Sequence, residues 1–210
     1  MTIALRLPRS TLLRHALLFA PAALLVILGT YLLSAFWNYN LAEIAIFAIA
    51  AGGLTVLTGI NGQLSLGHGA LMAVGAYTTS LLLKVQPGFP FILTLVAAIV
   101  TTALTGGVIG VAAARLRGPY LAGATLALAV GLPQVAIHFG SVFGGNQGLN
   151  VASPSPPASL GASFPQEQWL AWVAVVGAVL VLFLLANLVH GATGRTMRAV
   201  HDDETAARLA

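Results

Sequence analysis

Few side chains in this 210-residue chain could do chemistry, and His68 stands out among them. His68 follows Ser65 by three residues, a spacing that on a helix would place both side chains on one face. One interpretation is the dyad of an intramembrane serine protease, but the G-x-S-x-G elbow of such enzymes is absent. The other interpretation is two packed polar groups that hydrogen-bond across helices. The histidines are His15, His68, His138, His190 and His201.

A metal centre is not expected. No two histidines have a spacing such as H-x-x-x-H, and the chain contains no cysteine. Disulfides and thiolate metal sites are therefore excluded.

His68 lies in a run that is dense in polar residues and glycine, NGQLSLGHGA over residues 61–70. Tight helix packing around a turn is one interpretation, because small residues let helix backbones approach closely in lipid. The other is that the run lines a passage, since polar groups at membrane depth usually face a cavity. This second interpretation makes four side chains candidates for a substrate pathway: Asn61, Gln63, Ser65 and His68.

These residues must be positioned by elements that lie in lipid. Only 7% of the residues are charged and 58% are hydrophobic, which leaves too few polar residues to cover a soluble protein. A helix needs about 20 apolar residues to cross the hydrocarbon. The chain is predicted to be an all-α, polytopic bundle forming a single domain over 1–210. Its six spans are predicted at 16–36, 41–60, 64–83, 89–114, 119–139 and 169–190, with an external loop at 140–168.

The basic residues indicate the orientation of these spans. If each segment crosses once, three basic clusters share one side, and only Lys84 lies opposite. Because basic short loops stay in the cytoplasm, both termini, 1–15 and 191–210, are predicted to be cytoplasmic. The high basicity comes from these loops, so no nucleic-acid binding is expected. The clusters are Arg6, Arg9 and Arg14, then Arg115 and Arg117, then Arg195, Arg198 and Arg208.

Local signals refine the ends of the elements. Trp37 and Tyr39 suit a headgroup interface and are predicted to end the first span. Gly131 and Pro133 are predicted to interrupt the fifth span. The tail from 191 is predicted to be helical, with a second part that starts near Asp202 and Asp203, because acidic residues favour a helix start.

Four stretches form a pattern in a fixed order. They are GINGQLSLGHGA at 59–70 running on to GAY at 75–77, RLRGPYLA at 115–122 with TL at 125–126, GGNQGL at 144–149, and the tail 194–207. Together these stretches resemble the LivM-type permease subunits of branched-chain amino-acid ABC importers. The resemblance covers roughly residues 41–210, and the shared order and spacing make it fairly specific.

The resemblance implies a non-catalytic, multi-pass subunit of the bacterial inner membrane that forms a translocation path. It implies a LivH-like second permease subunit, two cytoplasmic ATPase subunits and a periplasmic amino-acid-binding protein as partners. The tail matches the loop that meets the ATPase. In that loop the implied coupling residues are Arg195, Arg198, Glu204, Ala206 and Ala207. The chain has no G-x-x-x-x-G-K-[ST] run, so no nucleotide site or other cofactor is expected.

The alternative function is a stand-alone secondary carrier or channel for amino acids or small amides such as urea. Carriers often place an ionisable residue in the middle of the membrane, whereas Glu43, the only acidic residue within a predicted span, lies near its end. The family's pattern continues past the tail with further spans, so a chain that stops at Ala210 is expected to be C-terminally truncated. The resemblance leaves open whether the substrate is Leu, Ile and Val or urea and short amides.

Overall fold

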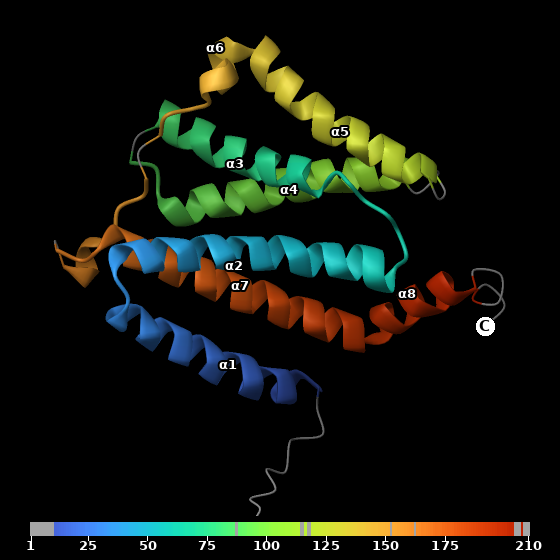
Figure 1. Ribbon diagram of the computed structural model, residues 1–210, viewed down its shortest axis with the longest axis horizontal. Coiled ribbons are helices and arrows are strands. Elements are labelled where there is room, and N and C mark those ends of the chain that lie inside the picture. Colours follow the sequence, from blue (N-terminus) through green and yellow to red (C-terminus); the bar gives the residue numbers. More distant parts are fainter. Residues whose placement is uncertain are drawn as a thin grey trace, which may run out of the picture. The chain divides into compact units, whose positions relative to one another are not determined.

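The computed structural model describes residues 11–86, 88–113, 116, 119–151, 153–161, 163–203 and 207, and the regular secondary structure in them is helical. No strand occurs in these ranges, which confirms the predicted all-α class. The chain divides into two compact units (Figure 1). Unit 1 comprises Met1–Gly62 and Ser155–Ala210, and unit 2 comprises Gln63–Pro154.

Several of the helices are long and apolar enough to cross a membrane. Among the described residues they are Leu12–Leu32, Ala35–Ile60, Phe91–Ala113, Tyr120–His138 and Gln166–His190. The third predicted span forms α3 (His68–Val85), which is not among these five. Its 18 residues include His68, Lys84, threonines and glycines, and these lower its hydropathy. The chain is therefore a multi-pass membrane protein, with α3 as its most polar long helix.

Unit 1 is built on two helices that lie side by side and run in the same direction, α2 (Ala35–Thr55) and α7 (Gln166–His190) (Figure 1). The small buried side chains of Ala45 and Ala178 pack with Val175 between these helices, which allows close approach in lipid. The other elements of unit 1 are α1 (Thr11–Gly29), η1 (Thr30–Leu32), the π-helical turn η2 (Val56–Ile60), η4 (Ala158–Leu160) and α8 (Ala192–Asp202).

The boundary between the first two helices differs from the prediction. The first span was expected to end at Trp37 and Tyr39, but both lie in the first turns of α2. The chain turns at Thr30–Ser34, where the Thr30 hydroxyl donates to the Ile27 carbonyl at 2.6 Å and Ser34 has extended backbone at the N-cap. This turn contains neither glycine nor proline, so its composition does not distinguish it from the apolar runs beside it, and the sequence gives no sign of a helix end there.

A buried polar cluster fastens α1, α2 and α7 together at one end of unit 1. Thr30 is 1% exposed, and its hydroxyl accepts hydrogen bonds from Gln168 Nε2 at 3.2 Å and Trp172 Nε1 at 2.8 Å. The Asn38 amide donates to the Thr30 carbonyl at 3.2 Å. One threonine therefore satisfies polar groups from two other helices.

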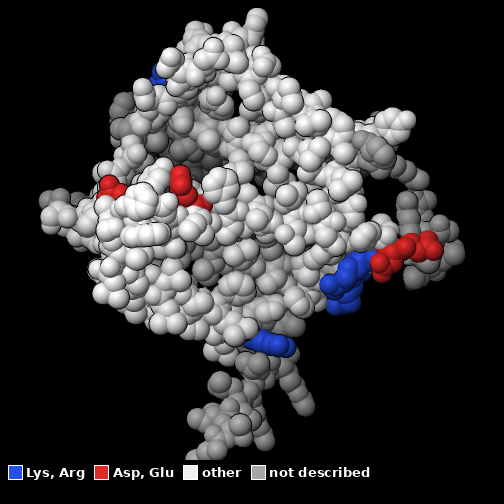
Figure 2. Space-filling model, in the orientation of Figure 1, with Lys and Arg blue, Asp and Glu red and all other residues white. Residues whose placement is uncertain are grey.

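The opposite end of unit 1 holds the basic residues. His15 Nδ1 lies 3.0 Å from Asn187 Oδ1, and the His15 ring meets the His190 ring edge-on at 5.1 Å. The start of α1 and the end of α7, which leads into α8, are therefore at the same end, and Figure 2 shows basic side chains over both regions. This agrees with the predicted common side for the first and third basic clusters. Arg6, Arg9, Arg115, Arg117 and Arg208 lie outside the described residues.

Unit 2 contains α3, α4 (Phe91–Ala113), α5 (Pro119–His138), α6 (Gly140–Phe143) and η3 (Gly145–Gln147). The Thr78 and Thr101 hydroxyls lie 2.9 Å apart and join α3 to α4. The predicted interruption of the fifth span is wrong, because α5 continues through Gly131 and Pro133. Proline removes only one backbone N–H, a loss that a helix among other helices tolerates.

The cluster around Thr30 yields a prediction about stability. Thr30→Val keeps the shape of the side chain but leaves the Gln168 amide and the Trp172 indole without an acceptor. We expect the free energy of unfolding to fall by about 1–3 kcal/mol, measured by thermal unfolding of the purified full chain in detergent.

The control is Thr55→Val, because the exposed Thr55 hydroxyl bonds only the Ala51 carbonyl of its own helix. Equal effects of the two substitutions would contradict the importance of the cluster.

Candidate functional site

The run over residues 61–70 is not one continuous helix. The π-helical turn η2 ends at Ile60, residues 61–67 are irregular, and α3 begins at His68 with Gly67 at its N-cap. Ser65 therefore precedes the helix, and the expectation that it shares a helical face with His68 is wrong. Gly67 and its neighbours stop the helical pattern, which removes the geometric basis of the serine protease dyad.

The irregular segment is held against α5. The Leu66 backbone N–H donates to Thr125 Oγ at 3.0 Å. A Cβ at position 67 would lie 3.0 Å from the Thr125 carbonyl oxygen, so glycine permits this close approach. Thr125 is 7% exposed and its hydroxyl also contacts the Leu121 carbonyl at 3.0 Å. A backbone group that leaves the helical ladder here is therefore paired inside the protein.

The four candidate pathway residues are divided between the units. Asn61 belongs to unit 1, whereas Gln63, Ser65 and His68 belong to unit 2. Gln63 is exposed, and the other three are half-buried. Within the described residues none of the four side chains has a hydrogen-bond partner. They remain free to meet water or a ligand, and their role as a pathway stays a prediction.

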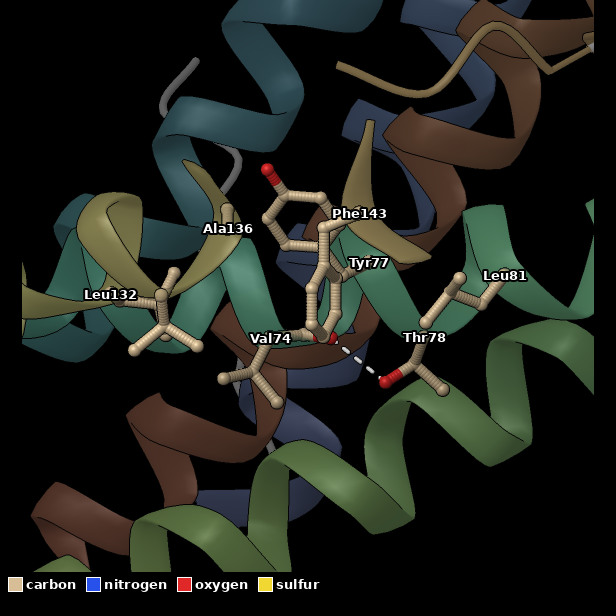
Figure 3. Close-up of a pocket in the computed structure, with 8 residues that line it drawn as sticks. Val74, Tyr77, Thr78, Leu81, Leu132, Ala136 and Phe143 are labelled. Carbon is tan, nitrogen blue, oxygen red and sulfur yellow. Dashed lines mark hydrogen bonds between the residues drawn. The ribbon is translucent and has the colours of Figure 1, made fainter. Parts of the chain in front are cut away.

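A pocket of about 220 Å³ opens in unit 2 between α3, α5 and α6 (Figure 3). Its walls are aliphatic and aromatic, and the Tyr77 and Phe143 rings meet edge-on with centroids 5.1 Å apart. Thr78 is the other hydroxyl-bearing residue in the lining. The lining residues are Val74, Tyr77, Thr78, Leu81, Leu132, Val135, Ala136 and Phe143.

The Thr78 hydroxyl is already engaged. It donates to the Val74 carbonyl at 2.8 Å, the dashed line in Figure 3, and it lies 2.9 Å from Thr101 Oγ. In Figure 3 the Tyr77 hydroxyl points away from Thr78 and Leu81. The pocket therefore presents an apolar interior.

The tail forms the predicted helix. In α8, which packs against α7 and η2, Gly194 is buried and Met197 is half-buried, whereas Arg195 and Arg198 are exposed. Arg198 Nη2 donates to the Val189 carbonyl at the end of α7 at 3.1 Å. The helix ends at Asp202, and the Ala207 N–H donates to the Asp203 carbonyl at 3.0 Å, which is consistent with the predicted two-part tail. Glu204 and Ala206, also predicted coupling residues, lie outside the described residues.

The last turn of α8 packs against the end of η2. Gly62 has a φ of +69°, and a Cβ there would lie 2.7 Å from His201 Nε2. The His201 ring therefore occupies the space that any other side chain at position 62 would need. Sequence reasoning singled out both residues but did not pair them, because nothing in the sequence brings α2 and α8 together.

Sequence reasoning also missed the pocket, although a signal was present. Val74, Tyr77, Thr78 and Leu81 follow the spacing i, i+3, i+4, i+7, which marks one helical face. Leu132, Val135 and Ala136 repeat part of that spacing on α5. In a membrane protein an apolar stripe more often faces lipid or a neighbouring helix, so the spacing alone did not indicate a cavity.

Known proteins share the sequence pattern of this chain. Residues 36–210 match the family described as branched-chain amino acid transport system / permease component. The chain is similar to the high-affinity branched-chain amino acid transport system permease protein LivM of Salmonella typhimurium and to that of Escherichia coli. Each is 30% identical over 186 residues, covering 78% of this chain and 43% of the relative. No solved structure matches the chain.

The chain thus spans less than half the length of the curated relatives it matches. The family match, in contrast, extends over most of the chain and includes both the 61–70 run and α8. On this basis the chain belongs to the family of permease components of branched-chain amino acid transport systems.

Proposed function

We propose that this chain is the membrane-spanning permease subunit of an ATP-driven ABC importer for branched-chain amino acids. The family match over residues 36–210 carries this proposal. A related membrane subunit would complete the translocation path in a bacterial inner membrane, and a periplasmic binding protein would deliver the amino acid. ATP hydrolysis would reside on two cytoplasmic ATPase subunits.

The proposed contact with the ATPase is α8 and the residues after it. One side of α8 packs on α7 and η2 through Gly194, Met197 and His201, whereas Arg195 is exposed. A short helix with one side anchored and the other open can dock in a groove of a partner. We place Arg195, Arg198, Glu204, Ala206 and Ala207 in this coupling segment.

The proposed substrate pathway includes the irregular run before α3. Asn61, Gln63, Ser65 and His68 lack partners among the described residues, and unpaired polar groups in a membrane protein favour a water-filled path. The contact between His201 and Gly62 supports a connection from α8 to the start of this run. A movement of α8 would thus act on the chain where it enters unit 2.

The stand-alone carrier is the weaker candidate. Glu43 is exposed on α2, and the family match is to a permease component of a transport system rather than to a carrier. We therefore propose that ATP hydrolysis on partner subunits, rather than an ion gradient, drives transport.

The energy source can be tested by reconstitution. We expect uptake of leucine into proteoliposomes to require the binding protein, the ATPase subunits and ATP, because this chain carries no nucleotide motif. The measurement is labelled leucine uptake with each component omitted in turn. Uptake by this chain alone, driven by a proton gradient, would refute the ABC proposal in favour of the carrier.

The coupling segment can be tested by reversing a charge. Glu204→Arg should abolish co-purification of the ATPase subunits, because it replaces an acidic side chain of the docking segment with a basic one. The control is Lys84→Glu, which reverses the charge of an exposed residue in the last turn of α3, outside the coupling segment in the sequence. Undiminished association of the Glu204→Arg variant would remove the docking role of the tail.

The contact of α8 with η2 predicts a different phenotype. Gly62→Val adds a side chain where His201 packs and places it in a left-handed backbone that costs about 1–2 kcal/mol. We expect ATP-dependent uptake to fall about tenfold, the equivalent of about 1.4 kcal/mol, while the ATPase subunits stay bound.

Gly59→Val is the matched control, since a Cβ at position 59 has its nearest neighbour at 3.9 Å. Uptake and ATPase binding should be measured in the same membranes. If Gly62→Val keeps full uptake, the contact plays no part in coupling.

A further inference from the structure

We infer that the pocket between α3, α5 and α6 binds the aliphatic side chain of the transported amino acid. The inference rests on the proposed function and goes beyond it by naming a subsite and the ligand chemistry that it selects. It is carried by the lining, the size and the hydrogen bonding of one cavity in unit 2.

The lining selects an alkyl group. Leu81, Leu132 and Val135 supply aliphatic walls, and the ring of Phe143 closes one side. The Thr78 hydroxyl donates its proton to the Val74 carbonyl and contacts Thr101, so it has no proton left to donate to a ligand. A buried alkyl group is stabilised by about 0.8 kcal/mol per CH₂.

The size fits a branched side chain. A volume of about 220 Å³ exceeds the roughly 150 Å³ of an apolar cavity that can hold benzene. An amino-acid side chain of three or four carbons is therefore small enough to enter the pocket. One side of the pocket is open, so the charged ammonium and carboxylate groups of an amino acid can stay outside it.

The same features exclude urea and short amides as occupants. Such ligands consist almost entirely of donors and acceptors, and a polar group transferred to apolar surroundings without a partner costs roughly 2–7 kcal/mol. The lining supplies only the Tyr77 and Thr78 hydroxyls, too few for a ligand with so many donors and acceptors. This distinguishes the two substrate classes that the sequence resemblance leaves open.

The pocket also borders the glycine-rich loop that follows Phe143, to which no role has been assigned above. Phe143 directly precedes Gly144 and Gly145, both with positive φ, and the turn η3 packs against α5 and α6. The loop fixes the position of Phe143, because a Cβ at position 144 would overlap the Gly148 carbonyl. It therefore sets one wall of the cavity.

The absence of cysteine from the chain gives a direct test. In Val135→Cys the new thiol is the only one in this chain, and it lies on the pocket wall at a position that is 50% exposed. The probe is the rate of maleimide labelling in membrane vesicles that contain the whole transporter, with leucine, isoleucine, valine or urea added.

We expect leucine, isoleucine and valine to slow the labelling at least threefold, and urea to leave it unchanged. Val85→Cys at the end of α3, which is 82% exposed and outside the pocket, is the matched control and should label at the same rate with every solute. Ala136→Leu, added to Val135→Cys, fills the pocket and should remove the protection by leucine. Leu81→Cys repeats the test from α3 if position 135 tolerates no change.

Three results would overturn the inference: equal protection by urea, no protection by any aliphatic amino acid, or a thiol that does not label at all. A thiol that never labels would mean that the cavity is closed to water and cannot receive a substrate. Labelling needs neither ATP nor uptake. The subsite can therefore fail while ATP-dependent leucine uptake persists, and loss of that uptake in the unmodified transporter would count against the proposed function instead.

Discussion

In hydrocarbon each polar group must find its partner within the protein, and this constraint explains where the chain can leave helical geometry. Leu66 has a backbone N–H outside any helix, and Thr125 of α5 accepts it at 3.0 Å. At the turn after α1, the Thr30 hydroxyl serves three groups at once. At these two places a threonine supplies the partner that the irregular chain would otherwise lack.

The two units are joined by the chain at residues of special geometry. One connection follows Gly62, which has a positive φ, and the other follows Pro154. Gly62 is also where the last turn of α8 packs, through His201. Within unit 1, α8, the helix proposed to meet the ATPase, therefore contacts Gly62, the last residue before the chain passes into unit 2. A π-helical turn directly before this point adds one residue per turn and loosens the regular ladder.

Long apolar runs predicted most of the helices, because in lipid the backbone has few alternatives. The bounds of α4 and α5 differ from the predicted spans by only one or two residues. The turn at Thr30–Ser34 was missed since its composition matches its surroundings, and Ser65 was wrongly placed on the helix of His68. The pocket could not be predicted, although its stripe on α3 is visible in the sequence, because pairing that stripe with Leu132 and Ala136 requires the packing of α3 against α5.

In the function proposed above, the apolar pocket and the polar run 61–70 would recognise different parts of an amino acid. A polar run can carry the ammonium and carboxylate groups that all amino acids share, but it cannot distinguish one aliphatic side chain from another. An apolar cavity distinguishes them by volume, since one methylene is worth about 1–3 kcal/mol in such a site. α3 carries the end of the polar run and one wall of the pocket, with His68 at its first residue and Val74 less than two turns later. If both proposals hold, a shift of α3 changes the polar and the apolar contacts of a bound amino acid together, and such a change would release the substrate.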